Sequence, residues 1–232
     1  MPEFRYDLHI HSTLSPCGEE EMSPNNIVGM AQILELDIIG VADHNTARNL
    51  PAVSALAQAA GILMVPAIEV TTAEEVHVLT LFPTLEAALE MGELLYQALP
   101  PVKNRPDIFG RQLVMDEEDT VIDTLDKLLI NATTLSIEKV FRQVRALGGV
   151  PIPAHIDKNA YSVISNLGFL PPELEAVTVE VSRPPFAGAA GCRVITDSDA
   201  HQLETMAMHD ADVLTLPERS VEAVLEVLKT AH

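Results

Sequence analysis

Short runs of β-branched and apolar residues alternate along this chain with stretches of helical periodicity, and this alternation is the feature that most restricts its fold. Seven runs are expected to be strands and an eighth closes the series: residues 5–10, 38–42, 63–70, 76–82, 150–155, 177–181, 193–196 and 212–216. Apolar residues spaced i, i+3, i+4, i+7 predict helices at 27–34, 53–60, 137–144 and 221–228. Repeated strand–helix units predict an α/β fold with a parallel sheet, either open or closed into a barrel.

The length of 232 residues suits one α/β domain, and 47% hydrophobic residues can fill a sizeable core. Residues 100–134 lack a clean period, so we interpret them as an insertion, part loop and part helix. Long irregular segments often serve as lids, but an inert surface excursion fits the sequence equally well. No apolar stretch approaches the ~20 residues of a membrane span, and residues 1–7 lack a signal-peptide profile. We therefore expect a cytoplasmic protein with no membrane partner.

The chain is strongly acidic, with 34 acidic and 14 basic residues and a formal net charge of −20. Proteins usually meet polyphosphate backbones with lysine and arginine, so this surface should repel long nucleic acid. We therefore expect no long nucleic acid as a partner. A small phosphorylated substrate is compatible with the charge if bound cations reverse the field locally.

Histidines mark the ends of the expected strands. The chain has eight histidines, and six lie in an expected strand or close behind one: His9, His11, His44, His77, His155 and His201. A parallel β/α fold gathers the C-terminal ends of its strands on one face, where active sites form. Imidazoles from distant segments should therefore meet there. His209 and His232, on helix or tail, are interpreted as ordinary polar residues.

Spacing within the strands adds geometry. Residues i and i+2 of a strand point the same way, so His9 and His11 can bind one ion. The same holds for Asp199 and His201 if the strand extends that far. Neutral imidazole is a common ligand for zinc, iron and manganese, and an ordered strand places two of them at little entropic cost.

His77 begins its expected strand, so it reaches the same face only if the chain turns back between Glu69 and His77. Carboxylates accompany the histidines at four positions: Asp43, Glu69, Asp197 and Asp199. Six imidazoles and several carboxylates at strand ends predict a site for divalent metal ions.

The two cysteines, Cys17 and Cys192, make neither a disulfide framework nor a CxxC pair, so both are expected to be reduced. Cys17 lies near the candidate metal site and has the chemistry of a ligand. The sequence nevertheless favours an ordinary loop thiol at this position.

Five short motifs occur in order along nearly the whole chain: DLHIHS, ADHN, PAIEV followed by a histidine, PAHID and TDSDAH. They resemble the motifs of the polymerase and histidinol phosphatase (PHP) family. The resemblance implies a distorted seven-stranded, TIM-like β/α barrel, here one PHP-type domain over residues 1–232 with 100–134 inserted. It also implies hydrolysis of phosphate esters with two or three divalent ions, usually zinc, manganese or iron.

The resemblance implies a role for most residues singled out above. Three ligand sets follow from it: His9, His11, Glu69 and Asp199 for one ion; Glu69, His77 and His155 for a second; His44 and His201 for a third. Asp43 would lie beside the metals and orient His44.

The third site lacks one ligand of the family pattern. Members often have an aspartate shortly after the HxH pair, where this chain has Pro16, which cannot coordinate through its side chain. The candidates to replace it lie in the same loop: Cys17, Glu19, Glu20 and Glu21. Among these we expect Glu19 to be the ligand.

Phosphate ester hydrolysis requires an activated water and neutralised charge, and paired metal ions provide both. We expect a metal-activated hydroxide to attack a small phosphomonoester, so that the enzyme is a phosphatase. Glu69 would bridge two ions ~3.5–4 Å apart. Asp199 or His201 would act on the leaving group, and Asp43 would support the catalytic site.

Basic residues near the active face are expected to bind the substrate phosphate. Arg183 and Lys158 follow expected strands, and Arg111 lies in the insertion, from which it can reach over the site. Two alternatives stay open: a metal-dependent amidohydrolase, which also begins with HxH on a barrel strand, and a non-catalytic, metal-stabilised regulatory module. The nearly complete ligand set favours an active enzyme.

Overall fold

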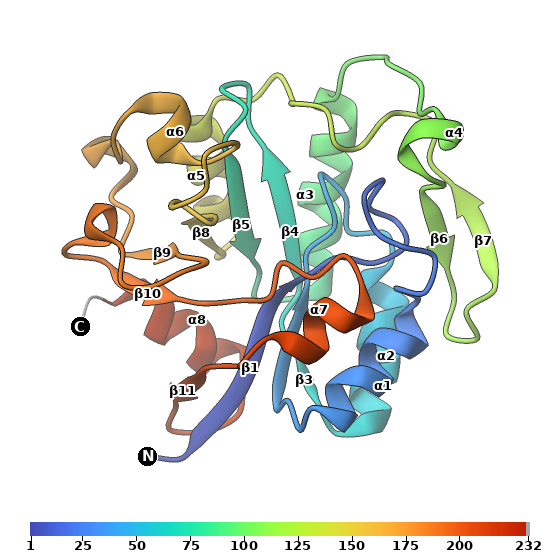
Figure 1. The fold of residues 1–232 in the computed structure, drawn as a ribbon, viewed down its shortest axis with the longest axis horizontal. Coiled ribbons are helices and arrows are strands. Elements are labelled where there is room, and N and C mark those ends of the chain that lie inside the picture. The colour runs from blue at the N-terminus through green and yellow to red at the C-terminus, as the bar shows by residue number, and fades with distance from the viewer. Residues whose placement is uncertain (231–232) are drawn as a thin grey trace.

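The computed structural model of the protein describes residues 1–230 and has an α/β architecture (Figure 1). Its strands are β1 (Glu3–Ile10), β2 (Ile38–Val41), β3 (Leu63–Met64), β4 (Ala67–Thr71), β5 (His77–Leu81), β6 (Leu113–Met115), β7 (Val121–Thr124), β8 (Val150–Pro153), β9 (Thr178–Glu180), β10 (Arg193–Ile195) and β11 (Val213–Thr215). Its α-helices are α1 (Pro24–Ile33), α2 (Leu50–Ala60), α3 (Leu85–Ala98), α4 (Pro106–Phe109), α5 (Ile137–Ala146), α6 (Val163–Leu167), α7 (Leu203–Met208) and α8 (Val221–Lys229). Short 3-10 turns at Pro172–Leu174 and Ala187–Ala189 flank β9. His232 lies outside the described residues.

The strands pair in four groups. The first sheet has the order β11-β1-β2-β3, the second β4-β5-β8, and β9 with β10 and β6 with β7 form two-stranded pairs. β1, β2 and β3 are parallel, as are β9 and β10, whereas β5 runs antiparallel to both β4 and β8. The α/β class is therefore confirmed, but within residues 1–230 the strands are not hydrogen-bonded into one closed barrel.

Single bridges bring the sheets together at one rim. Ile10 at the end of β1 bridges Ala200 beyond β10, and His44 beyond β2 bridges Glu69 in β4. β8 also packs against β9. The C-terminal ends of β1, β2, β8, β9 and β10 therefore meet on the same side of the molecule, and this rim is where a site can form.

The chain reverses direction between β4 and β5, which a repeated strand–helix pattern does not produce. Thr71 pairs with His77, and the Glu75 N–H donates to the carbonyl of Thr72 at 2.9 Å to close the turn. So short a turn cannot supply the dozen or more residues that a parallel crossover needs. The turn between Glu69 and His77 is thus confirmed, and it carries His77 to the rim.

Helices lie around the sheets and bury their apolar faces (Figure 1). The hydroxyl of Ser136 caps α5 by accepting from the Lys139 N–H, and Gly148 (φ 78°) follows the helix end. α3 was not predicted, although its buried residues have helical spacing: Ala88, Met91, Gly92 and Leu95. Among the helices of residues 1–230, none combines the length and the apolar composition that a bilayer span requires.

Residues 100–134 contain α4 and the β6–β7 ribbon, which stand at one side of the molecule (Figure 1). Two short strands thus occur where loop and helix were expected. The end of the segment returns to the rim, where the Asn45 side-chain amide donates to the carbonyls of Leu129 (2.7 Å) and Asn131 (3.1 Å). This anchor places Ile130 in the wall of the rim cavity.

Candidate metal centre

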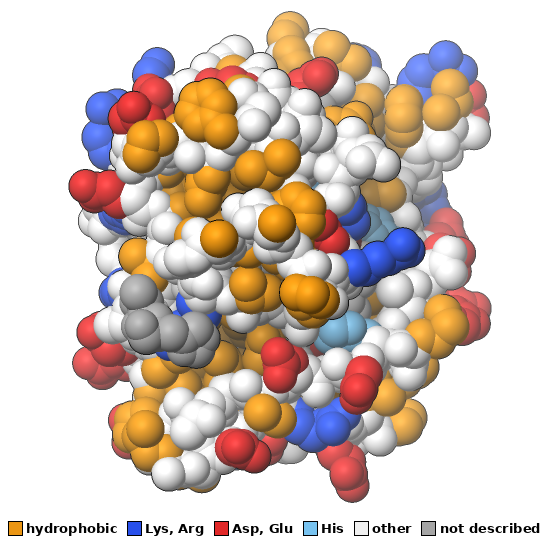
Figure 2. Space-filling view, turned by 60° about the vertical axis from the view of Figure 1, so that its left-hand side comes forward, with side chains coloured by type: hydrophobic (Ala, Val, Ile, Leu, Met, Phe, Trp, Pro, Cys, Tyr) orange, Lys and Arg blue, Asp and Glu red, His pale blue; other side chains and the backbone are white. Residues whose placement is uncertain are grey.

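Eight of the nine predicted ligands lie together at this rim, and only Glu19 points elsewhere. Their places in the fold are His9 in β1, His11 directly after β1, His44 after β2, Glu69 in β4, His77 at the start of β5, His155 after β8, and Asp199 and His201 after β10. A cavity of about 490 Å³ opens over them. Figure 2 shows histidine atoms reaching the surface on either side of a basic side chain.

Glu69 lies at the centre of the cluster and is 1% exposed. Its Oε1 lies 2.7 Å from His77 Nδ1 and 3.1 Å from His155 Nε2. Its Oε2 lies 3.0 Å from His44 Nδ1 and 3.3 Å from His11 Nε2. Each carboxylate oxygen therefore faces a different pair of imidazoles.

His9 and His11 are oriented by hydrogen bonds at Nδ1. His9 Nδ1 lies 2.9 Å from Glu180 Oε1, and a carboxylate accepts, so the proton belongs on Nδ1. His11 Nδ1 lies 2.9 Å from Ser15 Oγ, whose own proton goes to Asp43 Oδ1 at 2.7 Å. In the neutral rings that bind metals, both Nε2 atoms then carry lone pairs, and these atoms lie 3.2 Å apart. Two nitrogens at ~2.0–2.1 Å from one tetrahedral ion are about 3.3 Å apart, so a cation between them fits.

The other candidate metal-ligand atoms are separated by similar distances. Asp199 Oδ1 lies 3.2 Å from His11 Nε2 and 3.7 Å from His9 Nε2. His77 Nδ1 lies 3.3 Å from His155 Nε2. In three groups, one ligand atom from each residue lies within 4.8 Å of those of the others: His9, His11, Glu69 and Asp199; His44, Glu69 and His77; and His11, His44 and His201. Nitrogen and carboxylate donors in such groups are able to hold divalent metal ions.

Electrostatics keep the acidic donors ionised. Burial alone would raise the pKa of Glu69, but the surrounding imidazoles, His77 foremost, hold that pKa well below its usual range. Burial opposes ionisation of Asp199 as well, and His9 leads the groups that lower its pKa. Both carboxylates are therefore anionic at neutral pH, and the cluster attracts a cation.

Glu180 is a site residue that was not predicted. It ends β9 and is 2% exposed. Its Oε1 accepts from His9 Nδ1, and its Oε2 accepts the backbone N–H of His155 at 2.8 Å. One carboxylate thus orients the ring of His9 and fixes the backbone at His155. The available signal was an acid inside the expected strand 177–181, whose end lies at the same rim.

The carboxylate of Asp43 binds the loop after β1 and not the side chain of His44. Its carboxylate accepts the backbone N–H of Ser12 at 2.8 Å and the hydroxyls of Ser12 (2.6 Å) and Ser15 (2.7 Å). Because Ser15 in turn binds His11, Asp43 orients His11 through that hydroxyl. The expected orientation of His44 by Asp43 is therefore replaced by a different contact.

The loop after β1 presents Cys17 to the cavity and leaves Glu19 exposed. The backbone N–H of Glu19 donates to the carbonyl of His201 at 3.0 Å, but its side chain points to solvent. Gly18 permits this path, because a Cβ there would lie 2.4 Å from the carbonyl oxygen of Ser12. The structure thus does not bring Glu19 to the metal donors.

Of the three predicted phosphate-binding residues, one lines the cavity, one lines an adjoining hollow and one lies away from both. Lys158 lines the cavity and its ammonium contacts the carboxylate of Asp199, which raises the pKa of Lys158 against the opposing effect of burial. Arg183 lines an adjoining hollow of about 470 Å³ together with Asp199. Arg111 does not reach the site, because its Nε and Nη2 bind Glu20 Oε1 on the surface at 3.0 and 2.8 Å.

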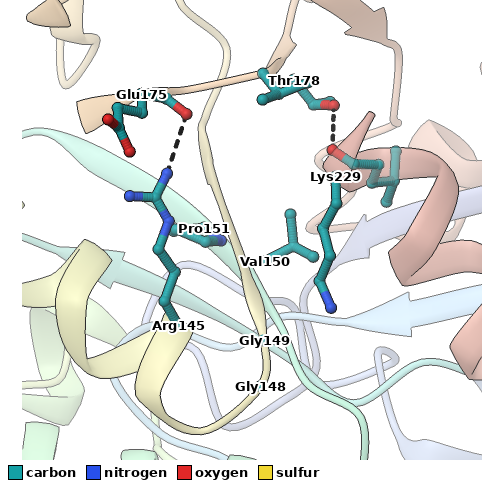
Figure 3. A pocket seen from close by; sticks show the side chains of 10 residues that line it. Arg145, Gly148, Gly149, Val150, Pro151, Glu175, Thr178 and Lys229 are labelled. Atoms are coloured by element: carbon teal, nitrogen blue, oxygen red, sulfur yellow. Dashed lines mark hydrogen bonds between the residues drawn. The ribbon is translucent and has the colours of Figure 1, made fainter. Parts of the chain in front are cut away.

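A second cavity, of about 290 Å³, lies at the opposite ends of β8 and β9 (Figure 3). Arg145 Nη2 donates to the carbonyl of Glu175 at 3.0 Å, and the Thr178 hydroxyl donates to the carbonyl of Leu228 at 2.7 Å. Its lining within the described residues includes none of the predicted site residues.

No family model matches the sequence, and a search of curated proteins found no match. Solved structures do match. Endonuclease Q from Pyrococcus furiosus, a lesion-specific endonuclease, aligns with a TM-score of 0.72 at 18% identity over 98% of this chain and 56% of that chain. Endonuclease Q in complex with a 27-mer duplex aligns with a TM-score of 0.66 at 16% identity over 98% and 57%. The present chain therefore spans little more than half the length of the endonuclease Q chains.

Phosphoesterase-like structures match as well. A two-domain protein from Bacteroides vulgatus, described as containing a predicted PHP-like metal-dependent phosphoesterase, aligns with a TM-score of 0.60 at 17% identity over 98% of this chain and 63% of that chain. A Bifidobacterium adolescentis protein assigned as a metal-dependent phosphoesterase aligns with a TM-score of 0.59 at 21% identity over 96% and 95%. An amidohydrolase from Chromobacterium violaceum aligns with a TM-score of 0.56 at 18% identity over 96% and 96%. This chain therefore shares its fold with PHP-like metal-dependent phosphoesterases.

The exclusion of long nucleic acid on charge alone is wrong. Endonuclease Q has the PHP fold and binds a duplex with an abasic lesion at its active site. A formal charge of −20 describes the whole surface. A substrate instead meets the local field of the site, which bound cations can reverse.

Proposed function

We propose that this protein is a metal-dependent phosphoesterase that hydrolyses a phosphate ester at the rim cavity. One observation carries the proposal: the buried carboxylate of Glu69 faces His77 and His155 with one oxygen and His11 and His44 with the other. A carboxylate placed in this way can bridge two ions, and paired ions suit in-line displacement at phosphorus.

The ligand sets follow from the same geometry. We assign His9, His11, Glu69 and Asp199 to one ion and Glu69, His77 and His155 to a second, with zinc, manganese or iron as the metals. When bound, such ions supply an activated water and neutralise charge on the phosphate. Glu180 and Ser15 hold the two rings of the HxH pair so that both Nε2 atoms face one point.

The chain's own residues would bind the substrate and manage the leaving group. Lys158 lines both the rim cavity and the adjoining hollow, where Arg183 and Asp199 also lie, so both basic residues can reach a phosphate oxygen. We assign the leaving-group proton to Asp199 or His201. Ile130 in the cavity wall supports a role for residues 100–134 as a cover over the bound substrate.

The substrate class is a phosphate ester, and we propose a small phosphomonoester. A cavity of about 490 Å³ accommodates a small molecule. Endonuclease Q shows that a DNA phosphodiester is also compatible with the PHP fold, so a DNA substrate belongs in the same test.

The test is an activity assay of the protein loaded with zinc, manganese or iron(II). The substrates are a panel of phosphomonoesters, a DNA duplex with an abasic site and a cyclic amide. We expect turnover of at least one phosphate ester, loss of turnover with chelator and recovery when the metal is restored. Turnover of the amide alone would instead identify an amidohydrolase, and metal binding without any turnover would indicate a regulatory module.

A further inference from the structure

The third group of donors, His11, His44 and His201, differs from the other two because it has no carboxylate. His201 Nδ1 lies 2.8 Å from the carbonyl oxygen of Asp199 and donates to it, which leaves Nε2 as the coordinating atom. Neutral imidazoles carry no charge. A divalent ion held by this group alone would keep both positive charges uncompensated.

Sharing of His11 makes this deficit larger. An imidazole nitrogen coordinates one ion at a time. His11 Nε2 lies 3.2 Å from both His9 Nε2 and Asp199 Oδ1, so an ion of the first set uses it. His44 and His201 are then the two members left for a third ion, and a tetrahedral site needs further donors.

Cys17 is a donor of the missing kind. Its side chain lines the same cavity as His44 and His201. A thiolate would supply the negative charge that the imidazoles lack.

Two backbone hydrogen bonds fix the loop around Cys17. The Gly18 N–H donates to the carbonyl of Ser15 at 2.9 Å, and the Glu19 N–H donates to the carbonyl of His201 at 3.0 Å. Cys17 lies inside the turn that the first bond closes. The second bond ties the loop to the backbone of His201, which carries one of the two remaining imidazoles.

We propose that the thiolate of Cys17 forms a third metal site with His44 and His201, and that this site takes a soft divalent ion such as zinc. The inference rests on the proposed function, because it assumes that the first two sets are filled. Sulfur and nitrogen donors suit zinc, whereas magnesium and manganese prefer oxygen. On binding, the S–H bond breaks, its proton goes to solvent and a sulfur–metal bond forms without electron transfer.

Cobalt(II) substitution tests this assignment without measuring activity. Cobalt bound to a thiolate absorbs strongly in the near ultraviolet through sulfur-to-metal charge transfer, and cobalt bound by nitrogen and oxygen does not. The variants are Cys17→Ser, Cys17→His and, as the matched control, Cys192→Ser. Cys192 is half-buried before β10, with its Sγ 3.6 Å from the carbonyl of Ala176.

We expect the absorption band in the wild type and in Cys192→Ser, and its loss in Cys17→Ser together with one fewer bound zinc per chain. Cys17→His should bind the additional zinc without the band. In parallel, zinc should protect Cys17 from alkylation by iodoacetamide and leave Cys192 unaffected.

Two results would overturn the role of Cys17 and leave the proposed function standing. One is a wild type that hydrolyses phosphate esters with metal bound but shows no band. The other is a Cys17→Ser protein that keeps both the band and the full zinc content. A wild type that binds no metal would overturn the third site and the proposed function together.

Discussion

The two main cavities differ in how their polar groups are satisfied. At the rim, His9 Nε2 and His11 Nε2 are fully buried and lie 3.2 Å apart, and both face carboxylate oxygens of Glu69 and Asp199. In the cavity at the opposite ends of β8 and β9, the guanidinium of Arg145 and the hydroxyl of Thr178 each donate to a backbone carbonyl. These two polar groups of the second cavity have hydrogen-bond partners within the protein. The imidazoles and carboxylates of the rim would instead be satisfied by a bound cation.

The comparison teaches that basic residues in a hollow are weak evidence of function. Arg145 and Lys229 line the second cavity, but Arg145 Nη2 donates to the backbone carbonyls of Leu174 (2.7 Å) and Glu175 (3.0 Å) and not to a ligand. Buried imidazoles that lie 3.2 Å apart among carboxylates are stronger evidence, because one cation between them satisfies both nitrogens and the acids together. The predictions below test this contrast.

The largest effect is expected for Glu69→Gln. The substitution removes the negative charge of the carboxylate that faces four imidazoles. Activity should therefore fall on the order of 10³-fold, the scale of losing a preorganised electrostatic group. The measurement is kcat with bound metal counted in parallel. Glu175→Gln at the second cavity is the control, because Arg145 binds the Glu175 backbone there. Retention of metal and activity by Glu69→Gln would break the contrast.

Removal of metal should destabilise the protein. The buried carboxylates and imidazoles lose the ion that compensates them, and binding to the native state stabilises it by about 4 kcal/mol at a thousandfold excess over Kd. Urea unfolding with zinc and with chelator measures the difference. In Glu69→Gln the same pair of curves should nearly coincide, and a large difference there would place the ion elsewhere.

Glu180→Gln should weaken metal binding without unfolding the protein. The amide oxygen can still accept from His9 Nδ1, but it no longer raises the basicity of that ring, so metal affinity should fall about 10- to 100-fold. Competition with a chromophoric chelator gives the affinity, and thermal unfolding of the metal-free variant monitors the fold. A loss of stability with unchanged metal affinity would make Glu180 a purely structural residue.

Lys158→Ala should raise KM about tenfold, the equivalent of one hydrogen bond to a charged group at roughly 1.5 kcal/mol. The cause is the lost contact with a substrate phosphate beside Asp199. Arg111→Ala is the matched control and should leave KM unchanged, because Arg111 is paired with Glu20 on the surface. An increase in KM for Arg111→Ala alone would mean that the insertion closes over the site.

The smallest effect on activity is expected for Arg145→Ala in the second cavity. It should leave kcat and KM unchanged and lower the unfolding free energy by about 1 kcal/mol through lost hydrogen bonds to two carbonyls. Steady-state kinetics and urea unfolding measure the two quantities. Reduced activity would show that the second cavity communicates with the rim.

Much of the site could be predicted from the order of the elements. The short strands and the amphipathic helices follow from local patterns, and the rim follows because C-terminal strand ends converge in a β/α fold. His9, His11 and Glu69 needed only their places in strands 5–10 and 63–70 to be brought together. The place of His77 could also be predicted, on the condition that the chain turns back between Glu69 and His77, and the antiparallel pairing of β4 with β5 meets that condition.

What the sequence by itself determined is the α/β class and the meeting of the imidazoles, because both depend on periodicities of two and 3.6 residues. The tertiary structure alone decided which side chain of the loop after β1 faces the cavity, since the hydrogen bond from the Glu19 N–H to the carbonyl of the distant residue His201 helps to set that path. It also decided that Glu180 reaches His9 and that Arg111 stays outside. Side chains on regular elements inherit their direction from the element, whereas side chains on loops take theirs from long-range packing.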